Sequence, residues 1–271
     1  MRTALTIAGS DSSAGAGVQA DLKTFAAFGV YGVSAITAIT VQSTKGVEAV
    51  APLSADLVTA QIEAVAGDFS IASAKVGMLA TAAIVEAVAA AIEELDLPLV
   101  VVDPVLVSTS GERLLDGDGV TALCNLLLPL ARVVTPNLPE AEAISGVRIS
   151  SAETMRRAAQ RIHEKGARAV IVTGGHEPDG AESRSQEVVD LVFDGHIFRE
   201  QRVARVESRH THGTGCTFAS AVAASLALGD DLAEAAARAQ RYVAGAIAHA
   251  PGLGHGRGPV DHFWELRRPP R

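Results

Sequence analysis

A glycine-rich turn directly before an apolar helix is the part of this sequence best suited to chemistry. The turn reads His-Gly-Thr-Gly-Cys at 212–216, small and apolar residues follow over 217–228, and Gly229 is a typical helix stop. Such glycines leave backbone N–H groups accessible at the positive end of the helix dipole, so a phosphate can approach closely. Because glycines before a helix also form ordinary tight turns, this segment alone leaves both interpretations open.

Cys216, the last residue of this turn, also has two interpretations. A thiol at a helix N-terminus has a lowered pKa and can react as a thiolate. A lone cysteine among alanines is more often a small packing residue. His210 and His212 lie close in the sequence, which keeps a cysteine–histidine nucleophile open without strongly supporting it.

Asn137 and Glu140 form a second pair of interest, because Pro139 predicts a helix start there and residues three apart face one way. An amide and a carboxylate so placed can hold Mg²⁺ through water. The alternative is that Asn137 caps the helix and Glu140 complements its dipole, and on these residues alone it is the better supported. Asp103, before Pro104, is either a turn former or a ligand carboxylate.

The N-terminal loop is polar and enters a helix that we expect to end near residues 28–29. It contains neither a dinucleotide-binding fingerprint nor a P-loop, and no P-loop occurs elsewhere in the chain. Asp21 is predicted to lie in the first turn of this helix, where it either hydrogen-bonds a substrate or helps the helix to start.

Six short apolar runs, predicted as strands, place these residues together. They cover 4–8, 33–39, 74–76, 99–102, 131–134 and 169–172, and each ends in polar residues or glycine. Ligands of open α/β sheets bind at the carboxyl ends of the strands. Six such ends, together with the glycine-rich turn, favour a site for a polar ligand, a metal and phosphates.

The alternation of these strands with helices, such as those expected at 82–95 and 153–165, predicts a doubly wound, mainly parallel α/β sheet flanked by helices. Asp194-Gly195 indicates a hairpin between runs at 188–193 and 197–206, which adds antiparallel strands at one edge. We expect a single domain over 1–266 and a loose tail over 267–271.

Composition narrows the class of partner. Of 271 residues, 48% are hydrophobic and 4% aromatic, which suits Val-rich buried strands under Ala-rich helices. The net charge of −8 and the lack of a Lys/Arg block argue against nucleic acid or an anionic membrane as partner. No signal sequence or membrane-spanning run is visible, and two cysteines make no disulfide framework. We therefore expect a cytoplasmic protein.

Six sequence blocks together resemble the bacterial hydroxymethylpyrimidine kinases of thiamine biosynthesis, in order and over nearly the whole chain. They lie at 8–24, 102–105, 135–141, 173–176, 211–216 and 254–259. The resemblance implies a single ribokinase-like domain, a homodimer, and ATP-dependent phosphorylation of 4-amino-5-hydroxymethyl-2-methylpyrimidine with Mg²⁺. Family members often phosphorylate the monophosphate again, to the diphosphate.

The resemblance also implies four groups of site residues, in which Asp21 and Gln42 would read the ring's amino and nitrogen groups. The substrate would lie among Gly9, Asp21, Gln42, Met78 and Val105; Asn137, Glu140 and Asp103 would organise Mg²⁺ and the ATP phosphates; Thr173, Gly175 and His176 would line the nucleotide; and Gly213, Thr214, Gly215 and Cys216 would form the anion hole. Cys216 stands where many ribokinase-like enzymes carry a basic aspartate.

The chain departs from the family pattern at three positions. Ala14 stands where the family usually has glycine, Ser43 replaces a common asparagine, and Thr109 replaces a common lysine. Thr109 puts in doubt a phosphate contact, and with it the second phosphorylation. The main alternative is a pyridoxal or pyridoxine kinase. A thiol hydrolase using Cys216 with His212, and a regulator that binds nucleotide without catalysis, are further alternatives.

Overall fold

A nine-stranded sheet forms the centre of the computed structural model, which describes residues 1–108, 111–175 and 186–267. The strand order is β3-β2-β1-β4-β5-β6-β7-β8-β9, and the strands from β2 to β7 in this order are parallel. The described strands are β1 Thr3–Asp11, β2 Tyr31–Ser43, β3 Gly46–Pro52, β4 Ile71–Val76, β5 Val100–Val102, β6 Val133–Val134, β7 Val170–Val172, β8 Glu187–Phe193 and β9 Phe198–Ala204.

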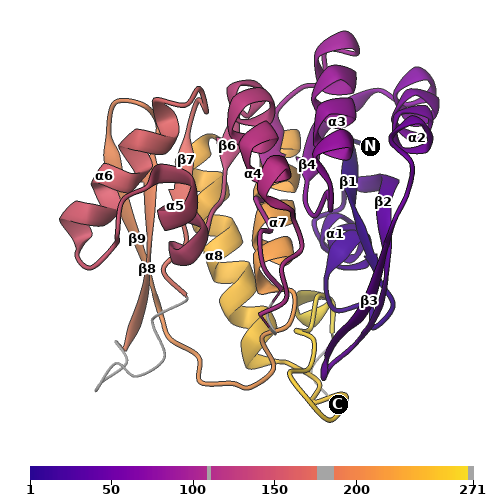
Figure 1. Cartoon of the computed structure of the whole chain (residues 1–271). Helices are drawn as coiled ribbons and strands as arrows, with labels where there is room; N and C mark the ends of the chain where they lie inside the picture. Colours follow the sequence, from indigo (N-terminus) through magenta and orange to yellow (C-terminus); the bar gives the residue numbers. More distant parts are fainter. Residues whose placement is uncertain (109–110, 176–185, 268–271) are drawn as a thin grey trace.

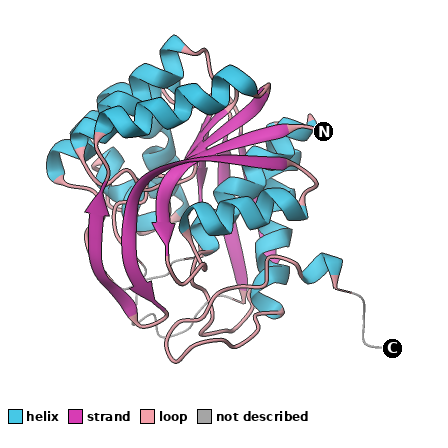
Figure 2. Cartoon of the chain, turned by 90° about the vertical axis from the view of Figure 1, so that its right-hand side faces the viewer, coloured by secondary structure: helices cyan, strands magenta, loops and turns pink. Residues whose placement is uncertain are grey.

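Helices cover both faces of the sheet (Figures 1 and 2). One apolar core lies between the sheet and α2 to α6, and the other lies under α1, α7 and α8. The described helices are α1 Gly17–Ala27, α2 Ala55–Asp68, α3 Ala82–Glu94, α4 Gly117–Ala122, a π-helical turn Leu123–Leu127, a 3₁₀ turn Leu128–Leu130, α5 Leu138–Ser145, α6 Ala152–His163, α7 Thr214–Leu228, α8 Leu232–Ala248 and a 3₁₀ turn Trp264–Leu266.

The valine-rich strands explain why both faces need helices. Along β5, Val100 and Val102 belong to the core under α3, whereas Val101 belongs to the core under α7. Successive side chains of a strand point to opposite faces, so a strand of valines alone buries both of its faces. This arrangement leaves the strand ends as the place where polar groups gather.

The sequence predicted this architecture with one omission. The six predicted strands, the helices predicted at 82–95 and 153–165 and the Asp194-Gly195 hairpin are present. The antiparallel strands expected at one edge are β8 and β9, and β3, which was not predicted, pairs antiparallel with β2 at the other edge. Most residues of β3 are exposed, so it lacks the apolar pattern by which a strand is predicted. The domain boundary at residue 266 stays a prediction, since residues 268–271 lie outside the described part.

None of the helices in the described part of the chain is long and apolar enough to cross a membrane.

Ala14 has a left-handed backbone conformation, with φ of 60°. This conformation brings Cβ of an L-residue close to the following carbonyl and costs roughly 1–2 kcal/mol, whereas glycine adopts it freely. The family's usual glycine at this position therefore has a steric reason, and this chain carries the strain.

We predict that Ala14→Gly raises the free energy of unfolding by about 1 kcal/mol, because it relieves that strain. Urea denaturation measures the change. The matched control is Ala64→Gly on the exposed side of α2, which should lower the unfolding free energy by a similar amount, since glycine weakens a helix interior. A loss of stability in both variants would contradict the prediction.

Candidate active site

A buried lysine lies near the carboxyl end of β4. Its side chain is fully buried, and Nζ lies 3.0 Å from Asp21 Oδ2 and 3.8 Å from Asp103 Oδ2. Burial alone would lower the pKa of Lys75, but the charges of Asp21 and Asp103 and the hydrogen bond to Asp21 raise it above its ordinary value. The ammonium is therefore charged. Sequence reasoning missed Lys75, although a lysine inside an apolar strand is itself a signal, because lysines are almost never fully buried without a partner.

Asp21 lies in the second turn of α1, not in the first turn as expected, and it has no exposed surface. Oδ2 accepts hydrogen bonds from Thr6 Oγ1 (2.6 Å) and Lys75 Nζ, and Oδ1 accepts one from Ser220 Oγ (2.6 Å). A carboxylate with these partners in the core anchors the lysine. The interpretation of Asp21 as a direct contact to a substrate ring does not fit this geometry.

Asp103 and Glu140 form a pair of buried carboxyl groups. Burial, helped by the charge of Asp21, raises the pKa of Asp103 to about 6 against the opposing effect of Lys75. Burial and the charge of Asp103 raise the pKa of Glu140 to about 7. Asp103 Oδ2 is a buried oxygen without a hydrogen-bond partner in the described chain. The two groups therefore repel each other, and a cation would relieve this repulsion.

Glu140 also helps to cap helix α5, as the alternative interpretation predicted. Asn137 Oδ1 accepts a hydrogen bond from the Glu140 N–H, and Glu140 Oε2 accepts one from the Asn137 N–H, which together cap α5. Glu140 Oε1 accepts from the Leu106 N–H. The described residues contain no group of three His, Cys, Asp or Glu side chains that could hold a metal. Two carboxylates with water suit Mg²⁺, which keeps several waters and takes few protein ligands.

The predicted anion turn forms the first turn of α7. Gly213 is the N-cap with φ of 83°, and the first helical hydrogen bond runs from the Thr217 N–H to the Gly213 oxygen. The Thr214 N–H donates to the Thr211 backbone oxygen (3.4 Å), whereas the N–H groups of Gly215 and Cys216 precede the first helical bond and have no carbonyl partner within the helix. They lie at the positive end of a fifteen-residue helix.

The Cys216 thiol is protonated near neutral pH. Burial raises its pKa to about 12, and Asp103 and Asp21 add to this, while Lys75 and a hydrogen bond from the Gly17 backbone oppose it. The expectation of a thiolate at a helix N-terminus is wrong here, because desolvation and two carboxylates outweigh the helix dipole.

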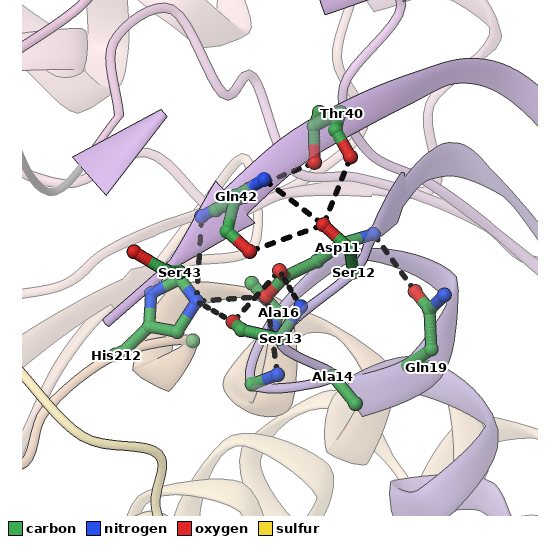
Figure 3. A network of polar contacts seen from close by, with 12 residues as sticks. Asp11, Ser12, Ser13, Ala14, Ala16, Gln19, Thr40, Gln42, Ser43 and His212 are labelled. Carbon is green, nitrogen blue, oxygen red and sulfur yellow. Dashed lines mark hydrogen bonds and ion pairs between the residues drawn. The ribbon is translucent and has the colours of Figure 1, made fainter. Parts of the chain in front are cut away.

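A polar network joins the N-terminal loop to this turn (Figure 3). His212 Nε2 lies 2.8 Å from Asp11 Oδ2, 3.4 Å from Gln42 Nε2 and 3.5 Å from Ser13 Oγ. Burial would raise the pKa of Asp11, but hydrogen bonds from His212, Ser13 and the backbone hold it at about 2. Because Asp11 engages Nε2, the geometry gives no support to a dyad of His212 with Cys216. Sequence reasoning did not pair Asp11 with His212.

Two glycines allow the N-terminal loop and the anion turn to lie in close contact. A Cβ on Gly213 would lie 1.8 Å from the backbone oxygen of Gly15, and a Cβ on Gly15 would lie 2.3 Å from the His212 ring. Gly213 also has a positive φ. No side chain fits at either position, so the loop and the turn pack backbone to backbone.

The predicted substrate residues fall into two groups. Gly9 and Met78 are neighbours, since a Cβ on Gly9 would lie 3.1 Å from Met78 Sδ. Gln42 and His212 line a pocket of about 470 Å³. Val105 has φ of 31°, a strained conformation for a β-branched residue, and such strain is concentrated at functional sites.

The predicted nucleotide residues lie at the ends of β6 and β7. Asn137 and Thr173 form a parallel bridge, which brings two of them side by side. The Gly174 N–H, next to Gly175, donates to Asp190 Oδ1 (2.9 Å), a buried carboxyl group that sequence reasoning missed. His176 and Thr109 lie outside the described residues.

Comparisons with known proteins agree with this geometry. A family model described as "Phosphomethylpyrimidine kinase" matches residues 11–261. The chain is 49% identical over 263 residues to a hydroxymethylpyrimidine/phosphomethylpyrimidine kinase of Rhizobium meliloti, covering 96% of each. It is 48% identical to a bifunctional thiamine biosynthesis protein of Geobacter sulfurreducens, with 96% of this chain but only 52% of that protein covered. Thus it spans about half of the bifunctional relative.

A solved structure with the same fold carries a different name. It is the pyridoxal kinase of Staphylococcus aureus in complex with AMP-PCP and pyridoxal, with a TM-score of 0.89 and 38% identity, and 98% of this chain and 95% of that chain are covered.

We predict that Asp103→Asn stabilises the protein increasingly as pH rises. The pKa of Asp103 rises from its ordinary 3.8 to about 6 on folding, so the wild type loses unfolding free energy as pH rises from about 4 through 6. A shift of two units corresponds to roughly 3 kcal/mol, and asparagine does not incur this loss. Urea denaturation from pH 4 to 8 without divalent metal measures the difference between variant and wild type.

The control for this experiment is Asp68→Asn, at the exposed end of α2. Its difference from the wild type should stay nearly constant over the same pH range. A pH-independent difference for Asp103→Asn as well would show that Asp103 carries no penalty on ionisation.

Proposed function

The chain belongs to the phosphomethylpyrimidine kinase family, and from this premise we propose how its candidate site works. It is a small-molecule kinase of thiamine biosynthesis, which phosphorylates 4-amino-5-hydroxymethyl-2-methylpyrimidine with ATP. The names of its relatives include both hydroxymethylpyrimidine and phosphomethylpyrimidine, which supports the second step to the diphosphate too. The observation that carries the site assignment is that the first turn of α7 and an Asp103 oxygen without a hydrogen bond both lie beside the buried Lys75 ammonium.

The anion turn holds the transferring phosphoryl group. Its charge is spread over three oxygens, and beside Thr214 the N–H groups of Gly215 and Cys216 are donors fixed in place before the reaction. Lys75 adds a positive charge beneath the turn. Phosphoryl transfer depends chiefly on positioning and charge stabilisation, so a protonated Cys216 thiol is compatible with turnover.

The two carboxyl groups whose pKa values are raised are the ones that we assign to the metal. Asp103 and Glu140 would hold Mg²⁺, largely through water, and the ion would neutralise charge on the ATP phosphates. Asn137, Thr173, Gly175 and His176 line the nucleotide in this proposal. The AMP-PCP bound to the Staphylococcus aureus kinase supports ATP as the phosphoryl donor.

Gln42 reads the pyrimidine edge, and Gly9, Met78 and Val105 pack against the ring. A side-chain amide offers one donor and one acceptor, which matches an amino group beside a ring nitrogen. Asp21 does not touch the ring in this proposal, because its hydrogen bonds hold Lys75 in place.

Two further properties complete the proposal. A homodimer is supported by the exposed apolar side chains of Ile39, Val41 and Val50 on the edge strand β3 and its neighbour β2, and size-exclusion chromatography tests it. A cytoplasmic location fits the kinase relatives and the absence of a membrane-spanning helix among the described residues.

Pyridoxal kinase is the second candidate, because a pyridoxal kinase shares the fold at 38% identity. Incubation with ATP, Mg²⁺ and the hydroxymethylpyrimidine, with pyridoxal in a parallel reaction, separates the two by mass spectrometry of the products. We expect the mono- and diphosphate of the pyrimidine. Formation of the monophosphate alone would exclude the second phosphorylation. Phosphorylation of pyridoxal alone would overturn the assignment of Gln42 to the pyrimidine ring and would leave the assignment of the phosphoryl-transfer residues intact.

We predict that Cys216→Ala lowers kcat roughly tenfold or more while the melting temperature changes little, because the thiol lines the anion turn. The pH–rate profile of the wild type between pH 6 and 9 should show no limb from a thiol, since the pKa of Cys216 is about 12. Steady-state kinetics and thermal melts measure both quantities.

Cys124→Ala is the matched control, because Cys124 is the only other cysteine and lies in the π-helical turn after α4. Its kcat should equal that of the wild type. Full turnover in the Cys216 variant would exclude a direct role for that thiol.

A further inference from the structure

The amide of Gln42 has a neighbour on each side (Figure 3). Nε2 lies 3.4 Å from His212 Nε2, and Oε1 lies 3.1 Å from Thr40 Oγ1. Half a turn about the last side-chain torsion exchanges the two amide atoms without moving the rest of the side chain. Hydrogen counting therefore decides which atom faces which neighbour.

His212 must present a hydrogen on Nε2. Asp11 Oδ2 lies 2.8 Å away and already accepts from the Gly15 and Ala16 N–H groups, as an ionised carboxylate does. The low pKa of Asp11, about 2, agrees with this state. A bare ring nitrogen would set a lone pair against that charge. With its only hydrogen donated to Asp11, Nε2 has no lone pair that could accept a hydrogen bond from a Gln42 N–H, so the atom of Gln42 that faces His212 is Oε1, which shares that hydrogen.

Thr40 leads to the same assignment independently. Its hydroxyl carries a single hydrogen, and Oγ1 lies 2.9 Å from the backbone oxygen of Ser10, to which it donates. Only lone pairs then remain for Gln42. The atom of Gln42 that faces Thr40 has to be the donor, Nε2. Both neighbours require the same orientation of the amide.

We propose that the Asp11–His212 pair and Thr40 fix the Gln42 amide with Oε1 toward the anion turn, and so select the orientation of the aminopyrimidine ring. The inference rests on the proposed function. His212 directly precedes Gly213, so the His212 side of the amide is the side of the anion turn. Asp11, His212 and Thr40 act here as positioning residues.

The ring chemistry gives this orientation a consequence. Each amide atom keeps one further hydrogen-bonding position, so Oε1 accepts from the 4-amino group and Nε2 donates to ring N3. In the pyrimidine, the carbon with the amino group lies between N3 and the carbon with the hydroxymethyl group. Placing the amino group on the His212 side therefore directs the hydroxymethyl group toward 213–216. The opposite amide would place N3 and the 2-methyl group on the His212 side and leave the hydroxyl remote from the phosphoryl site.

The 4-oxo analogue, 5-hydroxymethyl-2-methylpyrimidin-4-one, reverses the donor and acceptor at this edge. It therefore tests the amide orientation directly. The experiment measures kcat/KM with ATP for the amino and oxo compounds, and the readout is their ratio. The wild type should prefer the amino compound by about 10- to 100-fold, the usual discrimination of a bidentate pair. His212→Leu frees the amide to rotate, and the ratio should fall about tenfold or more.

Three other variants complete the design. His212→Gln restores a donor to Asp11 and should recover much of the ratio. Thr40→Val removes the other neighbour with little change of shape, and its ratio should fall as well, which keeps the test valid if His212→Leu does not fold. His249→Leu is the matched control at an exposed position that stacks on Trp264, and its ratio should stay at the wild-type value.

The outcomes separate the inference from the function. Equal losses on both compounds, with an unchanged ratio in the His212 and Thr40 variants, would mean a merely structural role and would overturn the inference alone. If the wild type phosphorylated neither pyrimidine, the proposed function would fail and the inference with it.

Discussion

The ammonium of Lys75, buried without access to water, is the charge around which the candidate site is arranged. A charge in the core is tolerated only when it is paired and hydrogen-bonded. Asp21 provides the pairing, and Thr6 and Ser220 satisfy the remaining positions on that carboxylate. Since Asp21 already balances the lysine, Asp103 has no full partner, and its negative charge is left for a cation. Burial, helped by the charge of Asp21, raises the pKa of Asp103, and a cation beside this carboxylate would offset that cost.

The second constraint is the backbone contact between the N-terminal loop and the anion turn. Gly15 and Gly213 meet without room for a side chain, and Asp11 and His212 tie the same two segments together. One segment follows β1, and the other begins α7. Because neither segment can shift without the other, in the proposed function the distance between substrate ring and anion turn is fixed by the fold rather than by the ligand.

The sequence was most informative where the physical cause is local. The valine runs of β5 to β7, the helix stop at Gly229 and the hairpin at Asp194-Gly195 depend on neighbouring residues, and all were predicted correctly. Lys75 with Asp21, and Asp11 with His212, are pairs separated by 54 and 201 positions. Their residue types were visible, but no local pattern identifies a partner that the sheet brings from so far away. The wrong expectation for the Cys216 pKa has the same origin, because the helix dipole is local whereas Asp103 and Asp21 are not.

The similarity to both pyrimidine and pyridoxal kinases follows from a division of the proposed site into residues for the phosphates and metal and residues for the ring. In the proposed function, the anion turn, the buried lysine and the two carboxyl groups act on phosphates and metal, and nothing in their geometry depends on which ring is attached. Ring choice in the same proposal depends on a few side chains at the ends of β1, β2 and β5. Apolar packing by Met78 and Val105 accepts any flat ring of similar size, since shape alone discriminates weakly between such rings. An amide held in one orientation discriminates more strongly, because a ring with the wrong donor and acceptor leaves polar groups unpaired. In the proposed function, specificity therefore resides in hydrogen-bond direction at Gln42 more than in the shape of the pocket.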